Sequence, residues 1–520
     1  MEQFVETVIA NARSLIEQVN VYRIKIISNV SRNKLTEAIT IGAQLLQKFG
    51  VTFPETPTPE EIEQSIAEVC QLIGDREIED LVNLPVMTDV EKIAIIQITN
   101  SIITPAYICG SPLAPLLISK SVKLSIQYGN TEDSASAYAT YAIMACNMLK
   151  NVDMGVKFGE LALGVVSKLD AKALKPEIFD VIGFFILHRK SHIKKTLPLV
   201  QEGYAVGLEV GNLQFAGYNA SAFCCNGFWC AQPLATLEQE TRAYCNGLVQ
   251  LNQLNAANWC RIYWQSILNL LGVAEHPSIL SGEAFQEVEF LPQLIEAHDN
   301  GGLFYFYSYK LMLCFLFGEF ESAQNHAVEV RRYLVASAGG FGEAAFYFYD
   351  SLVAVATFNQ QSEQTSELLE RVEQNQTQLQ QYWAKYAPMN HQHKVDLVAA
   401  EKCRVLGQFA EAMELYDKAI SGAKENEYIQ EEALANELAA KFYLNKDKEK
   451  FAAVHMQDAY YCYARWGAKA KTDDLEKSYP QLLAPILQTQ HHRIGLNQTH
   501  TSSIYKFYRL IQTIQTSSSS

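Results

Sequence analysis

The stretch GQFAEA at residues 407–412 decides the fold. It sets a glycine ahead of an apolar residue, Phe409, and places a small residue, Ala412, three positions further on. The glycine supplies a tight turn out of a preceding helix, and the alanine lets two helices approach closely. Apolar residues then recur every three or four positions up to Ala423, as a helix with one buried face requires. The stretch therefore predicts a helical hairpin whose first helix covers residues 399–406.

Two other stretches share this opening, KLTEA at residues 34–38 and GEFESA at residues 318–323. A helix, a tight turn and a second helix starting F-x-x-A are typical of a tetratricopeptide unit, which is about 34 residues long. The distance from Ala323 to Ala412 is not a whole number of such units, so we expect degenerate repeats. No run of alternating strand residues is evident. The predicted fold class is all-α, a degenerate tetratricopeptide-like helical-repeat superhelix with an extended concave surface.

The chain divides into three predicted parts. A lead-in helix covers residues 1–19, the tetratricopeptide-like array covers residues 20–485, and a polar tail or linker remnant covers residues 486–520. Within the array, Thr58 and Glu61 have the spacing of a capping box and predict the start of a helix.

The composition indicates a globular protein without a nucleic-acid partner. Hydrophobic residues make up 48% of the 520 residues, charged residues make up 19%, and the formal net charge is −15. Nucleic-acid binding draws most of its affinity from neutralised phosphates and needs a basic face. The densest basic group consists of Arg189, Lys190, Lys194 and Lys195, and we interpret it as a solvated helix end.

Cysteine usage and hydropathy predict a cytoplasmic protein. The 11 cysteines are odd in number and lie mostly in apolar helical stretches, as free thiols do in a reducing compartment. The N-terminus carries acids and shows no apolar signal core. The most apolar stretch, residues 303–317, contains Lys310 and is shorter than the roughly 20 residues of a membrane span. We therefore expect a buried helix there and no membrane insertion.

Motifs of catalysis are absent from the sequence. It contains no Walker-type phosphate loop, no protein-kinase catalytic loop, no D-F-G motif and no histidine followed by glutamate. The glycine-rich residues 339–342 follow no predicted strand and are interpreted as a turn. The adjacent acids Glu431 and Glu432 point in different directions on a helix, so we expect a solvated face instead of a general acid/base pair. The sequence thus predicts no catalytic residue and no cofactor.

Two clusters could suggest a metal site. Cys224, Cys225 and Cys230 lie close together in the sequence, and His391 and His393 lie in a predicted loop. Structural zinc normally needs four ligands in short paired spacings, and the cysteines have no second pair nearby. We therefore expect buried cysteines, solvent-exposed histidines and no metal-binding residue.

Two dense aromatic runs, at residues 304–309 and 346–349, allow two interpretations. Tyrosine is enriched at binding hot spots, so an exposed ligand platform is one of them. Aromatic side chains in a helical repeat more often fill gaps between neighbouring hairpins. Core packing is therefore the favoured interpretation.

The segment from Ala410 to Leu483 resembles a known family. The matching stretches are ELYDKAI at 414–420, QEEALANELAA at 430–440, RWGA at 465–468 and YP at 479–480. They resemble the helical region between the ATPase module and the GAF/histidine-kinase module of very large bacterial signalling proteins. These proteins are common in cyanobacteria and begin with a serine/threonine-kinase domain. Residues 204–228, 304–323 and 50–54 resemble the same region, so the likeness covers residues 20–485.

The resemblance implies a helical connector and carries over none of the flanking enzymes' catalytic residues. Trp466 and Tyr479 belong to the matching stretches and are interpreted as structural. Our leading hypothesis is a non-enzymatic scaffold that binds kinase, ATPase or sensor modules, in cis or in trans. The alternative is a regulatory domain that senses a small ligand or peptide in its concave face. An enzyme of unfamiliar type is the third hypothesis.

Overall fold

The computed structural model describes residues 14–32, 34–358 and 365–488. Within these ranges every regular element is a helix, and β-structure is limited to two isolated bridges, Val86 with Asn130 and Ser281 with Gln286. Successive helices pack as neighbouring pairs. The predicted all-α helical-repeat fold is confirmed, whereas the tetratricopeptide-like identity of the repeats stays a prediction. Most of the expected lead-in helix, residues 1–13, and the expected tail from residue 489 lie outside the described ranges.

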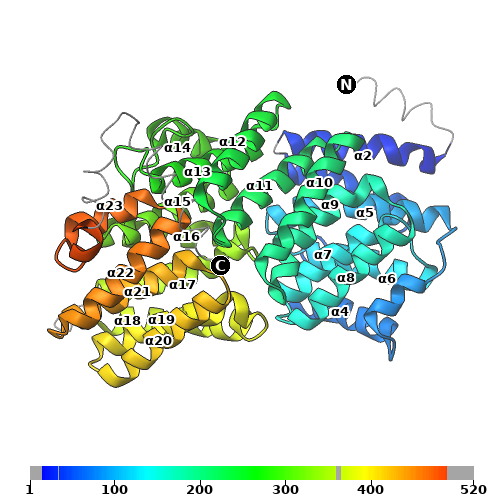
Figure 1. Cartoon of the computed structure of the whole chain (residues 1–520). Coiled ribbons are helices and arrows are strands. Elements are labelled where there is room, and N and C mark those ends of the chain that lie inside the picture. The colour runs from blue at the N-terminus through cyan, green and yellow to red at the C-terminus, as the bar shows by residue number, and fades with distance from the viewer. Residues whose placement is uncertain (1–13, 33, 359–364, 489–520) are drawn as a thin grey trace. The chain divides into compact units, whose positions relative to one another are not determined.

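The chain divides into two compact units, which are described separately. Unit 1 comprises the described residues up to Leu187 together with Glu202–Asn219, and unit 2 comprises His188–Gln201 and the described residues from Ala220 onward. Two helices contribute to both units, α10 (Thr196–Val210) and α11 (Leu213–Trp229). Figure 1 shows the helices of each unit.

Unit 1 is built from helices packed side by side around one core. Its elements are α2 (Leu15–Ser31), α3 (Leu35–Lys48), α4 (Pro59–Ile73), η1 (Ile78–Asn83), α5 (Val90–Ile108), α6 (Ala114–Tyr128), α7 (Ser134–Asn147), α8 (Val152–Lys168), η2 (Lys172–Leu174), α9 (Lys175–Val181) and η3 (Ile182–Ile186). The predicted capping box is confirmed at the start of α4. The Glu61 N–H donates to Thr58 Oγ1 at 3.2 Å, and the Thr58 N–H donates to the Glu61 carboxylate at 2.8 Å.

A close approach between α7 and α8 depends on a glycine. A Cβ at Gly155 of α8 would lie 2.2 Å from Cys146 Sγ and 2.8 Å from the Ala142 carbonyl oxygen of α7. Without that atom the Tyr141 and Phe158 rings come to 4.4 Å between centroids in the core. Dense packing of this kind is what a core of interlocking helices requires.

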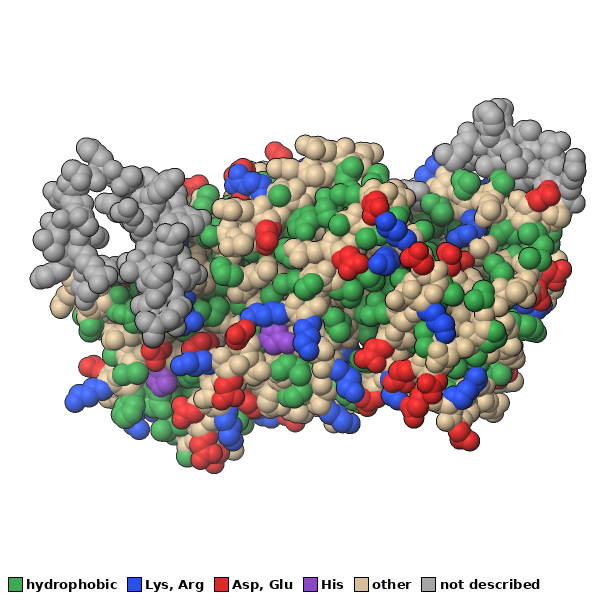
Figure 2. Space-filling view, turned by 45° about the vertical axis from the view of Figure 1, so that its right-hand side comes forward, with side chains coloured by type: hydrophobic (Ala, Val, Ile, Leu, Met, Phe, Trp, Pro, Cys, Tyr) green, Lys and Arg blue, Asp and Glu red, His purple; other side chains and the backbone are tan. Residues whose placement is uncertain are grey.

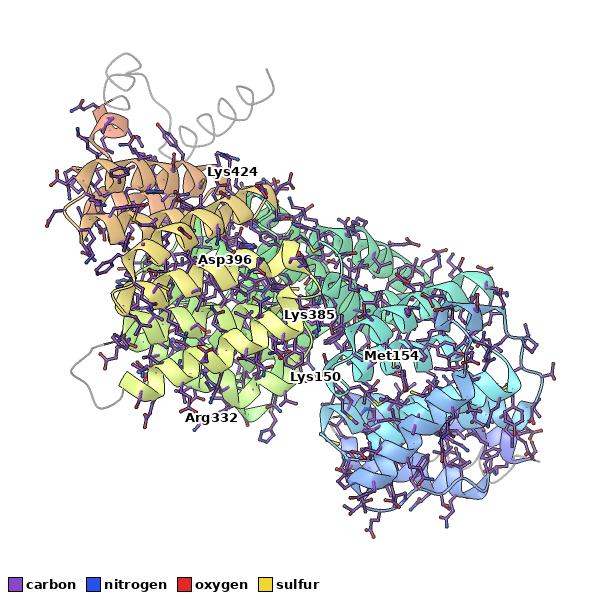
Figure 3. The ribbon with its side chains drawn as sticks, turned by 90° about the horizontal axis from the view of Figure 1, so that it is seen from below. Lys150, Met154, Arg332, Lys385, Asp396 and Lys424 are labelled. Atoms are coloured by element: carbon purple, nitrogen blue, oxygen red, sulfur yellow. The ribbon has the colours of Figure 1, made fainter. Side chains whose placement is uncertain are left out.

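Unit 2 is a series of helical hairpins. Its elements are η5 (Ile193–Lys195), α12 (Leu234–Gln250), α13 (Leu254–Leu270), α14 (Glu287–Glu296), α15 (Asn300–Leu316), α16 (Phe320–Tyr333), η6 (Leu334–Ser337), α17 (Phe341–Ala356), α18 (Thr365–Gln378), η7 (Leu379–Ala384), α19 (Pro388–Val405), α20 (Phe409–Glu425), α21 (Ile429–Leu444), α22 (Glu449–Trp466) and α23 (Lys469–Ser478), while η4 (Leu187–Arg189) starts in unit 1. Side chains fill the space between the ribbons, and Figure 3 labels Asp396 on α19 and Lys424 on α20.

The predicted hairpin turns are confirmed. Gly407 has φ +76° between α19 and α20, and Gly318 has φ +78° between α15 and α16, a backbone region that favours glycine. The small residues that follow, Ala323 and Ala412, are fully buried against the partner helices. The apolar stretch over residues 303–317 is confirmed as a buried helix, and Lys310 within it pairs with Glu287 at 3.0 Å. No helix among the described residues is long and apolar enough to cross a membrane.

Alternate helices of unit 2 pack against one another in series. α13 contacts α15, α15 contacts α17, α17 contacts α19 and α19 contacts α21. The last helix, α23, contacts α13, so the two ends of the series meet. The end of α22 is also joined to the turn before α12, because the Trp466 indole N–H donates to the Gln232 carbonyl oxygen at 3.2 Å.

The inner face of this series is filled by the chain itself. The ring of Trp229, at the end of α11, lies 5.5 Å from Tyr309 on α15 and 6.4 Å from Tyr349 on α17. Its carbonyl oxygen accepts a 3.0 Å hydrogen bond from Gln430 on α21. The ring and the backbone of this one residue thus contact three helices. In unit 2 a helix end and its aromatic residues therefore pack against the series of helices from which the extended concave surface was expected.

Candidate docking groove

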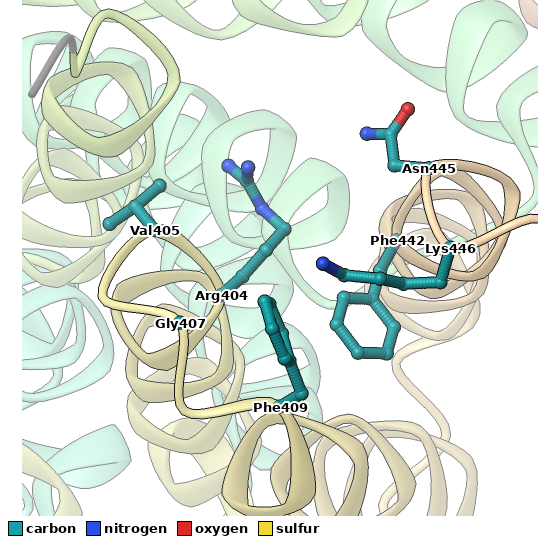
Figure 4. A pocket seen from close by; sticks show the side chains of 7 residues that line it. All are labelled: Arg404, Val405, Gly407, Phe409, Phe442, Asn445 and Lys446. Atoms are coloured by element: carbon teal, nitrogen blue, oxygen red, sulfur yellow. The ribbon is translucent and has the colours of Figure 1, made fainter.

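A groove of about 220 Å³ opens at the ends of two hairpins of unit 2 (Figure 4). One wall is the turn between α19 and α20, which closes through the Gln408 N–H and the Cys403 carbonyl oxygen at 2.9 Å. Because α20 starts directly after this turn, Phe409 stands at the helix end and keeps 41% of its surface exposed. Leu406, in the same turn, is also exposed.

The opposite wall is the end of α21. Phe442 is buried, and its ring lies 6.3 Å from Phe409 and 5.4 Å from Tyr416. Asn445 and Lys446 follow where α21 stops, and their exposed side chains form the rim. The groove is therefore an aromatic notch with a polar edge.

Among the described residues, one of the two cationic side chains beside the notch is paired with a carboxylate and the other is not. The Arg404 guanidinium donates to Glu401 from Nε at 3.0 Å and from Nη2 at 2.7 Å, so its charge is neutralised locally. Lys446 Nζ lies 3.4 Å from the centre of the Phe409 ring and pairs with no carboxylate of the described residues. A cation over an aromatic face gains about 0.5–1 kcal/mol at an exposed site. Lys446 therefore holds an available positive charge beside an exposed ring.

An apolar strip continues from the notch along α22, which we call the α22 strip. It consists of Phe451, Val454 and Tyr461, with 58%, 59% and 46% of their surfaces exposed. The first two lie three residues apart and share one side of the helix. The ring of Tyr443 on α21 stacks on Phe451 at 5.5 Å and joins the strip to the end of α21 beside the notch. Exposed, neighbouring apolar side chains of this kind mark interaction sites.

A buried ionic cluster joins α19 to α21 near the starts of these two helices. Lys394 and Glu431 are both almost completely buried, and the ammonium lies 2.8 Å from the carboxylate. Glu431 also bonds to His393 Nε2, and Lys394 donates to the Asn390 carbonyl oxygen at 2.6 Å. The ammonium lies 4.4 Å from the centre of the Tyr428 ring. Every formal charge of the cluster thus has a partner.

Three expectations about polar residues are wrong. His391 and His393 lie inside α19 and are buried, instead of lying in an exposed loop. Glu431 and Glu432 are buried, instead of forming a solvated face, because α21 is an inner helix with neighbours on several sides. Of the basic group expected at a solvated helix end, Arg189 is buried, and its guanidinium lies 3.9 Å from the centre of the Trp383 ring.

Burial and charge set the protonation states of the cluster. Burial, followed by the nearby Lys394, lowers the pKa of His391 well below its usual value and that of His393 to about 4. Burial alone would raise the pKa of Glu431, but Lys394 and His393 bring it below the usual value. Burial lowers the pKa of Lys394, and the adjacent Glu431 carboxylate opposes that shift. Near neutral pH both imidazoles are therefore neutral. Neither ring nitrogen of His391 has a hydrogen-bond partner among the described residues.

A second buried cluster joins α21 to the end of the array. Glu437 accepts from Lys441 at 2.7 Å, from Lys471 at 3.2 Å and from the Tyr463 hydroxyl at 2.8 Å. Burial alone would raise the pKa of Glu437, but the two lysines lower it to about 2. Lys471 also donates to the Leu316 carbonyl oxygen at 2.7 Å, which fixes α23 against the end of α15.

The cysteines and aromatic runs are part of the core, as expected. Cys224, Cys225 and Cys230 are buried free thiols, and burial raises the pKa of the last two to about 12. No group of three or more potential ligands among the described residues could hold a metal ion. In the runs 304–309 and 346–349, most aromatic side chains are buried, which confirms core packing.

One pair of carboxyl groups in unit 1 also has altered acidity. Asp180 is buried and Glu177 is half-buried on α9, three residues apart. Burial raises the pKa of Asp180 to about 8 and that of Glu177 to about 7. Altered carboxyl pKa values occur at catalytic sites and also in structural clusters. Neither residue lines the groove described above.

The comparisons with known proteins link the chain to signalling in general terms. No family model matches it. A segment of 61 residues is 39% identical to part of "Hybrid signal transduction histidine kinase G" from Dictyostelium discoideum. The match covers 12% of this chain and 2% of that protein. The resemblance to a histidine-kinase signalling protein is thus confirmed over a short segment.

Proposed function

We propose that the chain is a non-enzymatic helical-repeat scaffold or connector in signal transduction. It would bind or couple kinase, ATPase or sensor modules, in cis or in trans. Three findings support this proposal: the helical-repeat fold, the short match to a histidine kinase, and the resemblance to the connector of bacterial serine/threonine kinase proteins. The free thiols favour action in a reducing compartment such as the cytoplasm.

The main structural support for this proposal is the groove between the α19–α20 turn and the end of α21. Binding hot spots combine an aromatic anchor with a nearby polar contact, and the groove offers Phe409 beside Lys446. In unit 2 the inner face is occupied by the end of α11, so a protein partner would have to approach from outside. On the face of the molecule in Figure 2, acidic and basic side chains are interspersed, which favours a protein partner over a polyanion.

The test is a pull-down from native lysate with three forms of the tagged chain. These are the wild type, the groove variant Phe409→Ala/Lys446→Glu, and the control Lys477→Glu, which changes an exposed lysine on α23. Removing a hot spot costs about 2 kcal/mol or more, or roughly 30-fold in affinity. Circular dichroism and thermal unfolding establish that each form is folded.

Two outcomes decide the proposal. Recovery of a kinase, an ATPase or a sensor histidine kinase by the wild type and the control, with loss from the groove variant, supports a scaffold that uses this groove. Equal recovery by all three forms would refute the groove as the docking site. Recovery of no signalling protein by the wild type would refute the scaffold itself.

The alternative is a regulatory domain that senses a ligand or peptide, and the two aromatic runs of unit 2 do not favour it. The aromatic runs that could have formed a platform are mainly buried, and aromatic residues of α11 pack against them. A ligand would have to bind elsewhere on the chain.

A further inference from the structure

A second groove, of about 370 Å³, lies in unit 1 between α4, α6 and the loop of residues 50–54. Helix α4 contributes the positions 61, 64, 65 and 68, which share one face of the helix. Helix α6 contributes Leu116, Lys120 and Lys123. The volume lies in the range of small-molecule sites, about 300–1,000 Å³. Interfaces between helices are normally apolar, whereas this groove between α4 and α6 is lined mainly by polar and charged side chains.

Both carboxylates of the groove are already engaged. Glu61 accepts the Thr58 N–H of its capping box at 2.8 Å. Glu68 accepts from Lys123 Nζ at 2.5 Å and from Gln64 Nε2 at 3.3 Å. The acceptors of the groove are therefore used within the protein, and a bound cation would find no free carboxylate.

The donors of the groove are in surplus. Lys120 is half-buried, and its ammonium makes no hydrogen bond or ion pair with any residue that the structure describes. Burial, followed by the neighbouring Lys123 and Lys92, lowers the pKa of Lys120, and Glu68 opposes this shift. In the same way, the backbone N–H groups of Thr52 and Phe53 donate to no acceptor within the described residues. Glu68 attracts the Lys120 ammonium electrostatically but accepts no hydrogen bond from it. A half-buried ammonium that lacks a hydrogen-bond acceptor is unfavourable, and a bound anion would supply one.

We propose that this groove binds a small organic anion. A carboxylate or phosphate oxygen of the ligand accepts hydrogen bonds from the Lys120 ammonium, and its apolar part lies against Val51, Phe53 and Leu116. An oxyanion supplies the acceptors that the groove lacks, and charge-assisted hydrogen bonds to it are the strong kind. The proposal is independent of the scaffold role, because it concerns unit 1 and a small ligand.

The test measures the protection of Lys120 from acetylation in the whole chain. An amine-acetylating reagent is applied with hexanoate, hexyl phosphate or neutral hexanol, and the acetylation rate of each lysine is followed by peptide mass spectrometry. At a probe concentration about ten times its Kd, a bound anion slows acetylation of Lys120 about tenfold. Lys477, an exposed lysine of α23, is the internal control and keeps its rate.

Protection of Lys120 by hexanoate, by hexyl phosphate or by both supports the site and identifies the anionic group that it takes. Absence of protection by either anion, or equal protection by hexanol, overturns the proposal. A second measurement compares thermal unfolding of the Lys120→Met and Lys477→Met variants with the protecting anion. The anion should raise the unfolding temperature of the Lys477 variant only, and an undiminished rise in Lys120→Met would also overturn the proposal.

Discussion

Replacing Glu431 by glutamine is expected to destabilise unit 2 strongly. Glu431 is 2% exposed, and its carboxylate is the charged partner of the fully buried Lys394 at 2.8 Å. Glutamine keeps the shape and loses the charge, so the ammonium remains buried without compensation. Removing one partner of a buried pair costs about 3–5 kcal/mol, a large part of a typical unfolding free energy of about 5–15 kcal/mol.

The assay follows urea unfolding through tryptophan fluorescence. All five tryptophans lie in unit 2, at Trp229, Trp259, Trp264, Trp383 and Trp466. The signal therefore reports on the unit that contains the substitution. The matched control is Glu425→Gln, which changes an exposed carboxylate on α20 and should stay within about 0.5 kcal/mol of the wild type.

A double substitution separates the charge effect from simple loss of packing. When both charges are replaced, as in Lys394→Met/Glu431→Leu, no uncompensated charge remains, and such replacements are often nearly neutral. We expect the double variant to be more stable than Glu431→Gln. The reasoning is refuted if Glu431→Gln unfolds like the wild type, or if the double variant is no more stable than Glu431→Gln.

Two further predictions concern acidity and thiol reactivity. Because the folded-state pKa of His393 is depressed to about 4 and that of His391 is also lowered, the unfolded chain binds more protons below about pH 6.5. The unfolding free energy of unit 2 should therefore fall as the pH drops from about 6.5 toward 4, by about 3 kcal/mol for His393 alone. The measurement is the urea concentration at the midpoint of unfolding, followed by tryptophan fluorescence. An equal midpoint at about pH 7 and pH 5 would contradict this prediction. Under native conditions iodoacetamide should modify the exposed Cys70 and Cys109 and leave the buried Cys225 and Cys230 unmodified until the chain unfolds. Mass spectrometry measures the labelling rate of each cysteine, and equal rates would contradict the burial of Cys225 and Cys230.

The hairpins could be predicted from the sequence because their signals are local. A glycine, an aromatic residue and an alanine within six positions determine the turn at Gly407 and the start of α20. The same is true of the capping box at Thr58 and Glu61. Such signals depend on backbone conformation and neighbouring side chains, which nearby residues specify.

The buried charges could not be predicted because their partners are distant in the chain. Glu431 lies 38 residues from His393, and Lys471 lies 155 residues from the Leu316 carbonyl oxygen that it bonds. Hydrophobic periodicity assumes that a helix has one solvated side, so polar residues are assigned to that side. Helix α21 is an inner helix, and its acids are buried next to cations from other helices. The docking groove escaped prediction for the same reason, since Phe409 and Lys446 meet only in the folded chain.

The filled interior of unit 2 limits where a partner can bind. An open helical-repeat array offers its concave face, where partner binding costs no rearrangement of the repeats. Here a partner on the inner face would first have to displace Trp229, which contacts α15 and α17 and accepts a hydrogen bond from α21. Exposing a buried aromatic side chain costs several kcal/mol, comparable to the whole gain from a hot spot. The groove beside Phe409 and the α22 strip are already exposed, so binding there requires no such step and leaves both buried ionic clusters intact.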